Sequence, residues 1–308
     1  MSVSYLRLEG TITALITPFK DGEIDTDALV SHLEWQIRLG VSGVVACGTT
    51  GEAATLSRAE RGLVIFRCVD VANNKIPVLV STGTNSTEAT IELTAEAKSL
   101  GADAALIVTP YYNKPSQEGL YRHYEAITRA VDLPVIVYNV PSRTGVDLAP
   151  RTLERLSQLP NIVGIKDATG DIGRHLSTTP DVKARLFLLS GHDTTALAFN
   201  LCGGNGTISV AANVVPRLMV SMHRAIACRD VQEAIAIQQR LQPLISALER
   251  ETNSGPVRYA LHFLRGTSPE VRLPLSAITP ETAAEIRGAL EPLMEDRDTN
   301  ATAFRIVA

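Results

Sequence analysis

Short apolar, β-branched runs recur along most of the chain and predict strands. Near-continuous apolar runs of this length are typical of strands that are buried on both faces, as in a parallel sheet. The runs begin at Thr11, Gly43, Pro77, Ala104, Pro134, Ile162, Leu186 and Gly206. We therefore expect eight buried strands.

Segments with helical periodicity separate these runs. Residues 26–40 carry apolar side chains mostly on one side and end at Gly40, a suitable helix stop. Residues 86–101 open with Ser86 as an N-cap, but Ala89 stands where a complete capping box would need an acidic or amide residue. The alternation indicates a repeated βα unit.

Eight βα units in succession predict an α/β fold, specifically a (β/α)8 TIM barrel. A doubly wound sheet is the competing fold, but the GxGxxG motif is missing after the first run. The glycine cluster at 203–206 is interpreted as a turn.

Beyond the eighth run the sequence predicts a C-terminal helical extension, with helical segments at about 214–248, 256–264 and 279–293. No low-complexity linker separates it from the barrel. We therefore divide the chain into a barrel that carries the active site, residues 1–228, and a C-terminal helical segment packed on it, residues 229–308.

Composition narrows the range of partners. The chain has 308 residues, 45% of them hydrophobic and 20% charged, and a net charge of -4, which gives no basic footprint for nucleic acid. The basic residues are scattered and no uncharged apolar run approaches the roughly 18 residues of a membrane span, so no membrane partner is expected.

The same survey favours a cytoplasmic protein without metal or cofactor. The chain start lacks the pattern of a secretory signal, and the four cysteines lie far apart, as expected for reduced thiols. The six histidines show no HExxH or similar spacing.

Lys166 is unusual because it lies near the end of an apolar run. Strand alternation would place Ile162, Gly164, Lys166 and Ala168 on one face and Val163, Ile165 and Asp167 on the other. A lysine is rarely buried unless it is paired or functional. Taken alone, this stretch favours a structural role, in which the Lys166 ammonium reaches the solvent-exposed end of the strand and pairs with Asp167 or another carboxylate.

The barrel fold changes that interpretation, because barrel active sites lie at the C-terminal ends of the strands. Polar and aromatic residues gather there: Thr49 and Thr50, Tyr111 and Tyr112, Tyr138 and Arg143, Lys166, Gly191 and His192, and Ile208. Each alone has a structural explanation, such as a turn, an interface tyrosine or a surface ion pair. Their concentration at one end favours an active site.

The residue types predict Schiff-base chemistry. Burial disfavours the charged form of an amine, and the neutral amine of Lys166 would attack a carbonyl carbon. Gly164 would leave room for a small adduct, and Tyr138 would move protons as the carbinolamine collapses. Hydroxyls and backbone donors around Thr49 and Thr50 would hold a carboxylate. Together they indicate a Schiff-base-forming, class I aldolase-type lyase acting on a small 2-oxo acid.

Longer motifs carry a family resemblance. "GTTGEAATL", "TPYYNKPSQEGLYRHY", "YNVPSRTG", "GIKDATGD" and "SGHD" followed by "GGNGTISVAANVVP" occur in the order seen in the dihydrodipicolinate synthase (4-hydroxy-tetrahydrodipicolinate synthase) family. The chain resembles that family over nearly its whole length, within the N-acetylneuraminate lyase-like class I aldolase superfamily. The resemblance implies a TIM barrel that condenses pyruvate with L-aspartate 4-semialdehyde in diaminopimelate and lysine biosynthesis.

The resemblance also assigns roles to residues. Its catalytic set is Lys166, which condenses with pyruvate, Tyr138 as proton donor and acceptor, and Thr49 as a relay to Tyr112, which in the family enters the partner subunit's site. Its substrate-binding set is Thr50 for the pyruvate carboxylate, Arg143 for the semialdehyde carboxylate, Gly191, and Ile208 as a backbone contact near the lysine. It implies no cofactor or metal, and a homotetramer built as a dimer of dimers.

The sequence departs from the family at two places in these motifs. His192 stands where members often carry an acidic or amide residue, and Ser254 stands where relatives often have proline. The first departure could alter the rim of the site. The sequence does not indicate what the second changes.

A further departure concerns the effector site where many bacterial members bind lysine. Asn85 and Tyr111 match that site, but Arg58, Arg61 and Ala89 replace its histidines and its glutamate. Losing the glutamate removes a partner for the lysine ammonium, and the arginines add like charge. We predict weak or absent inhibition by L-lysine.

Two alternative functions remain at this point. A related lyase or aldolase could act on another 2-oxo acid, as hydroxy-oxoglutarate and sugar-acid aldolases do. Arg143 argues against this function and His192 keeps it open. A non-enzymatic paralogue using the barrel as a scaffold would be expected to lack Lys166 or Tyr138, and both are present.

Overall fold

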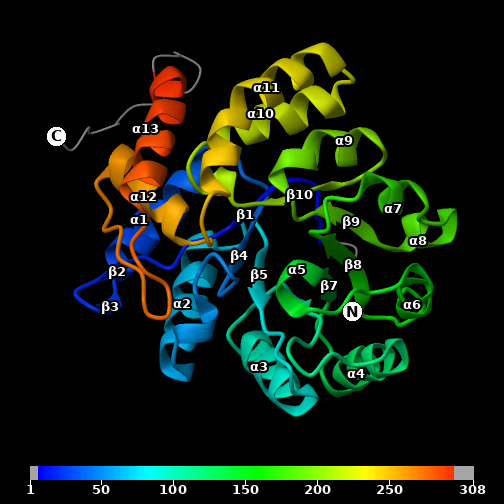
Figure 1. Ribbon diagram of the computed structural model, residues 1–308. Coiled ribbons are helices and arrows are strands. Elements are labelled where there is room, and N and C mark those ends of the chain that lie inside the picture. The colour runs from blue at the N-terminus through cyan, green and yellow to red at the C-terminus, as the bar shows by residue number, and fades with distance from the viewer. Residues whose placement is uncertain (1–5, 295–308) are drawn as a thin grey trace.

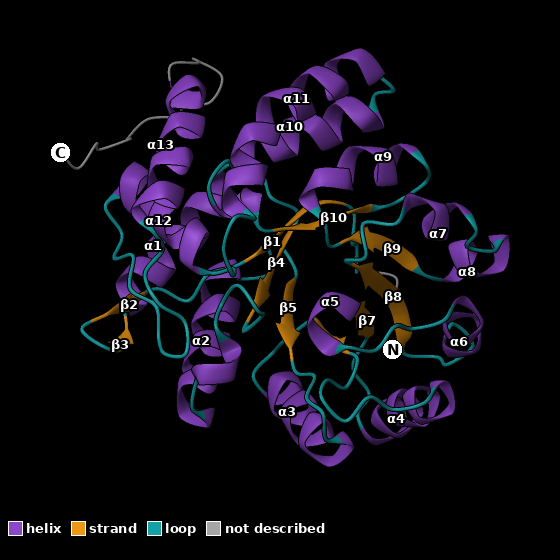
Figure 2. Ribbon diagram, in the orientation of Figure 1, coloured by secondary structure: helices purple, strands orange, loops and turns teal. Residues whose placement is uncertain are grey.

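The computed structural model describes residues 6–294 and confirms the TIM barrel. Eight parallel strands close into a ring, with β1 pairing both β10 and β4 (Figures 1 and 2). Each predicted apolar run contains or overlaps one strand. The strands are β1 Gly10–Ala14, β4 Gly43–Ala46, β5 Val78–Ser81, β6 Ala104–Val108, β7 Val135–Asn139, β8 Ile162–Asp167, β9 Phe187–Ser190 and β10 Gly206–Ser209.

Helices surround the ring of strands, as Figure 2 shows in purple. They are α1 Thr26–Arg38, α2 Arg58–Ala72, α3 Thr87–Ser99, α4 Gln117–Ala130, α5 Pro141–Thr144, α6 Pro150–Leu156, α7 Ile172–Leu176, α8 Pro180–Arg185, α9 Ala196–Leu201 and α10 Pro216–Ala227. α3 begins after Ser86, whose side chain accepts the N–H of Ala89 as the predicted N-cap. None of the described helices is long and apolar enough to cross a membrane.

The C-terminal part differs from the prediction in one respect. The segment predicted as a single helix from 214 to 248 is two helices, α10 and α11 Val231–Leu248, and Arg229 between them has a left-handed φ of 60°. α12 Gly255–Arg265 and α13 Pro280–Met294 follow and lie beside α1 (Figure 1). A short hairpin, β2 Phe19–Lys20 and β3 Glu23–Ile24, was not predicted.

α10 to α13 share one apolar core with the loops above β1 and β10. The division at residue 228 falls between α10 and α11 and stays a prediction. Residues 295–308 of its second part lie outside the described range.

The barrel interior is filled by one apolar layer to which every strand contributes. Its members include Ile12, Val45, Leu79, Leu106, Ile136, Val163, Leu189 and Ile208, all buried. Tyr138 belongs to the same cluster. The interior is therefore a packed apolar core.

A β-bulge in β8 corrects the predicted alternation. The register with β7 shifts by one residue between Ile162 and Gly164, so Val163 is an extra residue. Val163 therefore packs in the barrel interior, whereas Ile162 packs with Ile165 under the outer helices. The predicted faces of Ile162 and Val163 were wrong, because a bulge reverses alternation for the residues before it.

Candidate active site

Lys166 lies near the C-terminal end of β8 and faces Tyr138. The two residues are register partners across β7 and β8, and the lysine Nζ lies 4.3 Å from the centre of the tyrosine ring. Both are buried, with 7% and 8% of their surface exposed. The two residues with the most specific predicted roles therefore lie together inside the barrel mouth.

Asp167 is not the partner of Lys166. Its carboxylate points to the other side of β8 and forms an ion pair with Arg174, with Nε and Oδ2 3.2 Å apart. No carboxylate in residues 6–294 forms an ion pair with Lys166. The pairing favoured by the strand alone was wrong, because alternation and the outer arginine draw Asp167 away from the amine.

Gly191, at the end of β9, provides the space that Lys166 occupies. A Cβ atom on Gly191 would lie 2.7 Å from Cε of Lys166 and 3.0 Å from its Cγ. At Gly164 the same atom would instead meet the carbonyl oxygen of Phe187 at 2.9 Å. The expectation that Gly164 leaves room for an adduct was therefore wrong, since backbone fills that space.

The loop after β4 offers donors for a carboxylate. The N–H groups of Thr49 and Thr50 donate to no acceptor in the described part of the chain, while those of Gly51 and Glu52 are used within the turn. Thr50 is buried, and its hydroxyl accepts a hydrogen bond of 2.9 Å from Nδ2 of Asn253. Successive unpaired N–H groups in a turn suit an anionic group.

A buried ion pair anchors this loop to α12. The Glu52 carboxylate lies 2.6 Å from Nε of Arg258 and accepts a 2.6 Å hydrogen bond from the Ser254 hydroxyl. The second Glu52 oxygen accepts the N–H of Arg272 at 3.0 Å. Neither Glu52 nor Asn253 is predicted from the sequence, because their partners are about 200 positions away. The structure also gives Ser254 a role, as a hydrogen-bond donor to Glu52.

Two cavities share Arg143 and are lined by neighbours of Lys166, Tyr138 in one and Gly191 in the other, although Lys166 itself lines neither. One, of about 520 Å³, is lined by Thr49, Tyr138 and Tyr111 among others, and the second, of about 690 Å³, by Gly191 and His192. Arg143 is exposed and forms no ion pair with a described carboxylate. The planar, permanently charged guanidinium group of Arg143 is suited to binding the carboxylate of a ligand at this position.

Cys47 lines the smaller cavity but is unsuited to nucleophilic chemistry. Burial raises the pKa of its thiol to about 11, and the nearby Arg61 only partly opposes this. The thiol is therefore protonated at neutral pH and is a poor nucleophile. Lys166 therefore remains the candidate nucleophile of the site.

The rim of the larger cavity carries His192, Asp193 and Glu249. His192 bonds Thr195 through Nδ1 at 3.0 Å, and its Nε2 lies 3.9 Å from the Glu249 carboxylate. Asp193 is buried and accepts the N–H groups that follow β10, those of Val210 and Ala211, at 2.9 Å each. Asp193 was not predicted from the sequence, and it fixes the loop after Ile208.

Some predicted residues are not brought into the site. Tyr112 is 88% exposed, has a left-handed φ of 72° and lines neither cavity. No hydrogen bond among the described residues joins it to Thr49 or Tyr138. Ile208 is buried in the barrel interior, and Asn85 lines neither cavity, although the adjacent Thr84 lines the smaller one; the Asn85 carbonyl accepts a hydrogen bond from Asn113.

A TIM barrel whose C-terminal mouth encloses a buried lysine beside a tyrosine is typical of the lyases of the class I aldolase type. The particular family follows from comparison. The chain belongs to the dihydrodipicolinate synthetase family, whose model matches residues 7–293.

Individual relatives agree with this assignment. The 4-hydroxy-tetrahydrodipicolinate synthase of Rhodospirillum centenum is 50% identical over 281 residues, which cover 91% of this chain and 97% of the relative. A chloride-inhibited dihydrodipicolinate synthase from Acinetobacter baumannii, solved in complex with pyruvate, superimposes with a TM-score of 0.90 at 46% identity and covers 94% and 98% of the two chains. The enzyme from Thermotoga maritima superimposes with a TM-score of 0.91 at 40% identity, covering 93% of this chain and 99% of that one.

Proposed function

We propose that this chain is a 4-hydroxy-tetrahydrodipicolinate synthase, which condenses pyruvate with L-aspartate 4-semialdehyde through a Schiff base on Lys166. The observation that carries the proposal is the buried Lys166 amine, held over the Tyr138 ring at 4.3 Å without a carboxylate partner in the described chain. Relatives at 44–50% identity bear the same enzyme name, and one similar structure contains pyruvate.

The first half-reaction consumes pyruvate. Its carboxylate would bind the N–H groups of Thr49 and Thr50 and the Thr50 hydroxyl. The Lys166 amine attacks the keto carbon, and a proton moves from nitrogen to the former keto oxygen. Tyr138 would carry the protons that allow this carbinolamine to lose water and become an iminium. Loss of a methyl proton then gives the enamine.

The second half-reaction consumes the aldehyde. The enamine carbon attacks the aldehyde carbon of the semialdehyde, whose carboxylate would bind Arg143. The aldehyde oxygen takes up a proton and becomes the 4-hydroxyl. The amino group of the semialdehyde then attacks the iminium carbon, closes the ring and releases the Lys166 amine. The ring formation explains why the second substrate must be an amino aldehyde.

The assembly belongs to the same proposal. Tyr112 is nearly fully exposed, and Phe66 and Leu63 on α2 are also exposed apolar residues. These features support a homotetramer built as a dimer of dimers in which Tyr112 enters the partner's site and Thr49 relays its proton to Tyr138. Reduced cysteines and the biosynthetic role support a cytoplasmic location.

Trapping tests the proposal directly. Pyruvate plus borohydride should add a stable adduct to the peptide that contains Lys166, and Lys166→Ala should abolish it. Turnover of the pyruvate-loaded enzyme should then be fastest with L-aspartate 4-semialdehyde. An absent adduct would exclude any Schiff-base function, and preference for an aldehyde without an amino group would instead support a related 2-oxo acid aldolase.

A further inference from the structure

The outer side of the β7–β8 pair carries a polar network directly behind the two reactive residues. Tyr138 pairs with Lys166 in the register, and the next positions, Asn139 and Asp167, also pair. Because side chains alternate along a strand, Tyr138 and Lys166 face inward while Asn139 and Asp167 face the outer layer. Asn139 is completely buried. A substitution that moves Asn139 or Asp167 therefore acts on the residues directly adjacent in sequence to Tyr138 and Lys166.

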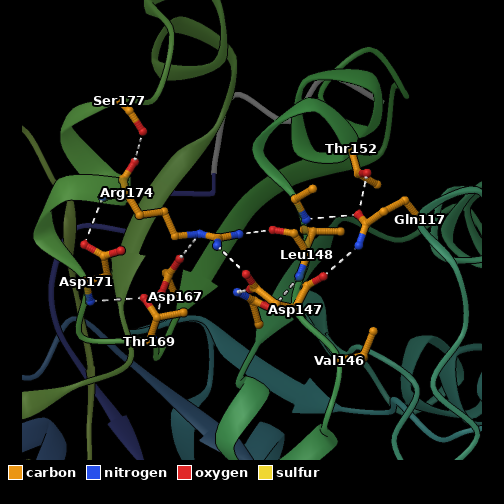
Figure 3. Close-up of polar contacts among 12 residues, drawn as sticks. Gln117, Val146, Asp147, Leu148, Thr152, Asp167, Thr169, Asp171, Arg174 and Ser177 are labelled. Carbon is orange, nitrogen blue, oxygen red and sulfur yellow. Dashed lines mark hydrogen bonds and ion pairs between the residues drawn. The ribbon is translucent and has the colours of Figure 1, made fainter.

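Arg174 of α7 connects the two outer residues through a loop. Its Nε lies 3.2 Å from Asp167, and its Nη1 lies 2.7 Å from Oδ2 of Asp147. The other Asp147 oxygen accepts a 2.8 Å hydrogen bond from the Asn139 side chain, whose own oxygen accepts the N–H of Leu148. Figure 3 shows the guanidinium between Asp167, Asp147 and the Leu148 carbonyl, to which it also donates.

Further contacts hold both ends of this network. Asp167 accepts hydrogen bonds from the N–H and the hydroxyl of Thr169, at 2.8 and 2.6 Å. Gln117 of α4 donates to the Asp147 carbonyl at 2.7 Å (Figure 3). The loop that contains Asp147 also returns from α5, the short helix that presents Arg143. The network therefore connects the C-terminal ends of β7 and β8 with the loop that follows α5, the helix that carries Arg143.

The electrostatic stability of this network depends on Arg174. The side chains of Arg174 and Asp167 are only 15% and 14% exposed, so their interactions are poorly screened by water. One guanidinium bridges two carboxylates in a fork geometry that lysine cannot reproduce. Without it, the Asp167 carboxylate at the end of β8 would lose its cation while 14% exposed, which is costly, and the half-exposed Asp147 in the loop after α5 would lose the same partner.

We propose that Arg174 is a positioning residue, which holds β7 and β8 so that Tyr138 and Lys166 keep their mutual geometry. This inference rests on the proposed function, because it assigns Arg174 a role in Schiff-base formation. Arg174 acts through the strands and touches no substrate. Proton transfer in the carbinolamine step needs Tyr138 and Lys166 at a fixed separation, and displacements of about 1 Å can cost 10²-fold in rate.

The test compares Arg174→Met and Asp147→Asn with Arg155→Met. Arg155 on the neighbouring α6 also forms an ion pair, with Glu118 at 2.9 Å, but within residues 6–294 it forms no hydrogen bond or ion pair with the ends of β7 and β8. We expect about 10- to 100-fold lower kcat for Arg174→Met, a similar fall in the rate of borohydride-trapped adduct formation and a smaller change in KM for pyruvate. Arg174→Lys should restore part of the loss, and Arg155→Met should behave as wild type.

A double variant separates positioning from general destabilisation. If Arg174 acts through the reactive pair, Arg174→Met should cost much less in a Tyr138→Phe background than in wild type. Equal costs in both backgrounds, or a normal trapping rate in folded Arg174→Met and Asp147→Asn, would overturn the inference. Wild-type protein that forms no adduct would instead refute the proposed function, so the two failures are distinguishable.

Discussion

Gly191 and Lys166 fit together so closely that a side chain on the glycine would displace the lysine. A Cβ atom on Gly191 would lie 2.7 Å from Cε of Lys166. We therefore expect Gly191→Ala to lower the rate of pyruvate adduct formation by about 10²-fold, because the amine must move out of its place beside Tyr138. Mass spectrometry of the borohydride-trapped Lys166 peptide measures the effect.

Gly288 provides the matched control for this substitution. It lies in α13, where an added Cβ meets no atom within 4 Å, so Gly288→Ala should leave trapping unchanged and stabilise the helix by about 0.5–1 kcal/mol. Normal adduct formation in Gly191→Ala would show that Lys166 can shift without loss.

Ser254 contributes to stability through the buried Glu52–Arg258 pair. Its hydroxyl donates to Glu52 at 2.6 Å and accepts from Arg258 at 3.0 Å. Ser254→Ala should lower the free energy of unfolding by about 1–3 kcal/mol in urea titrations, because it leaves buried charged groups less well bonded. Ser246→Ala, on an exposed face of α11, should stay within about 0.5 kcal/mol of wild type. Equal stability of the two variants would contradict this role.

His32 should make the fold sensitive to acid. Burial, with a smaller contribution from Arg265, lowers the pKa of its imidazole to about 4, although the bond to Asn213 opposes this. The folded state therefore disfavours protonated His32. The contribution of neutral His32 to the free energy of unfolding is complete above pH 6.5 and is lost as the pH falls towards 4. The loss amounts to about 3 kcal/mol at most.

His32→Gln tests this pH dependence. Glutamine cannot titrate, so the variant should lose less unfolding free energy than wild type between pH 6.5 and 4. His123, whose pKa burial also lowers to about 4, remains in both proteins and preserves part of the dependence. Identical pH profiles of unfolding free energy for the two proteins would argue against a role for His32.

Tyr112 should act in the site of a partner subunit. Neither Lys166→Ala nor Tyr112→Phe should be active alone, since each lacks one part of every site. When the two are unfolded and reassembled together, mixed dimers should regain activity, because a site can combine Lys166 of one protomer with the partner's Tyr112. Full activity of Tyr112→Phe alone would place Tyr112 outside catalysis, and mixtures as inactive as the separate variants would place it in its own protomer's site.

L-Lysine should inhibit weakly or not at all. Arg58 is engaged with Glu96 at 2.9 Å, Arg61 donates to the Ser81 carbonyl, and Ala89 offers no carboxylate for the lysine ammonium. Steady-state assays with L-lysine should therefore show no inhibition at micromolar concentration. Ala89→Glu, which supplies a carboxylate after the Ser86 cap, should increase sensitivity, whereas micromolar inhibition of the wild type would refute the prediction.

The sequence by itself determined the order of elements and the end of the barrel where chemistry occurs. Buried parallel strands need continuous apolar runs, so eight of them were visible in a single chain. Lys166, Tyr138 and Arg143 could be placed at strand ends because a βα repeat brings all C-terminal strand ends to one side. These features depend on local periodicity, which a sequence records directly.

Tertiary structure alone decided which groups meet. Three features follow from how neighbouring elements are placed. They are the bulge at Val163, the ion pair of Asp167 with Arg174, and the space that Gly191 leaves for Lys166. Ser254 meets Glu52 across 202 positions of sequence only because the barrel closes and α12 packs against it. Such contacts depend on the relative placement of distant segments, and residue order within one segment carries no record of that placement.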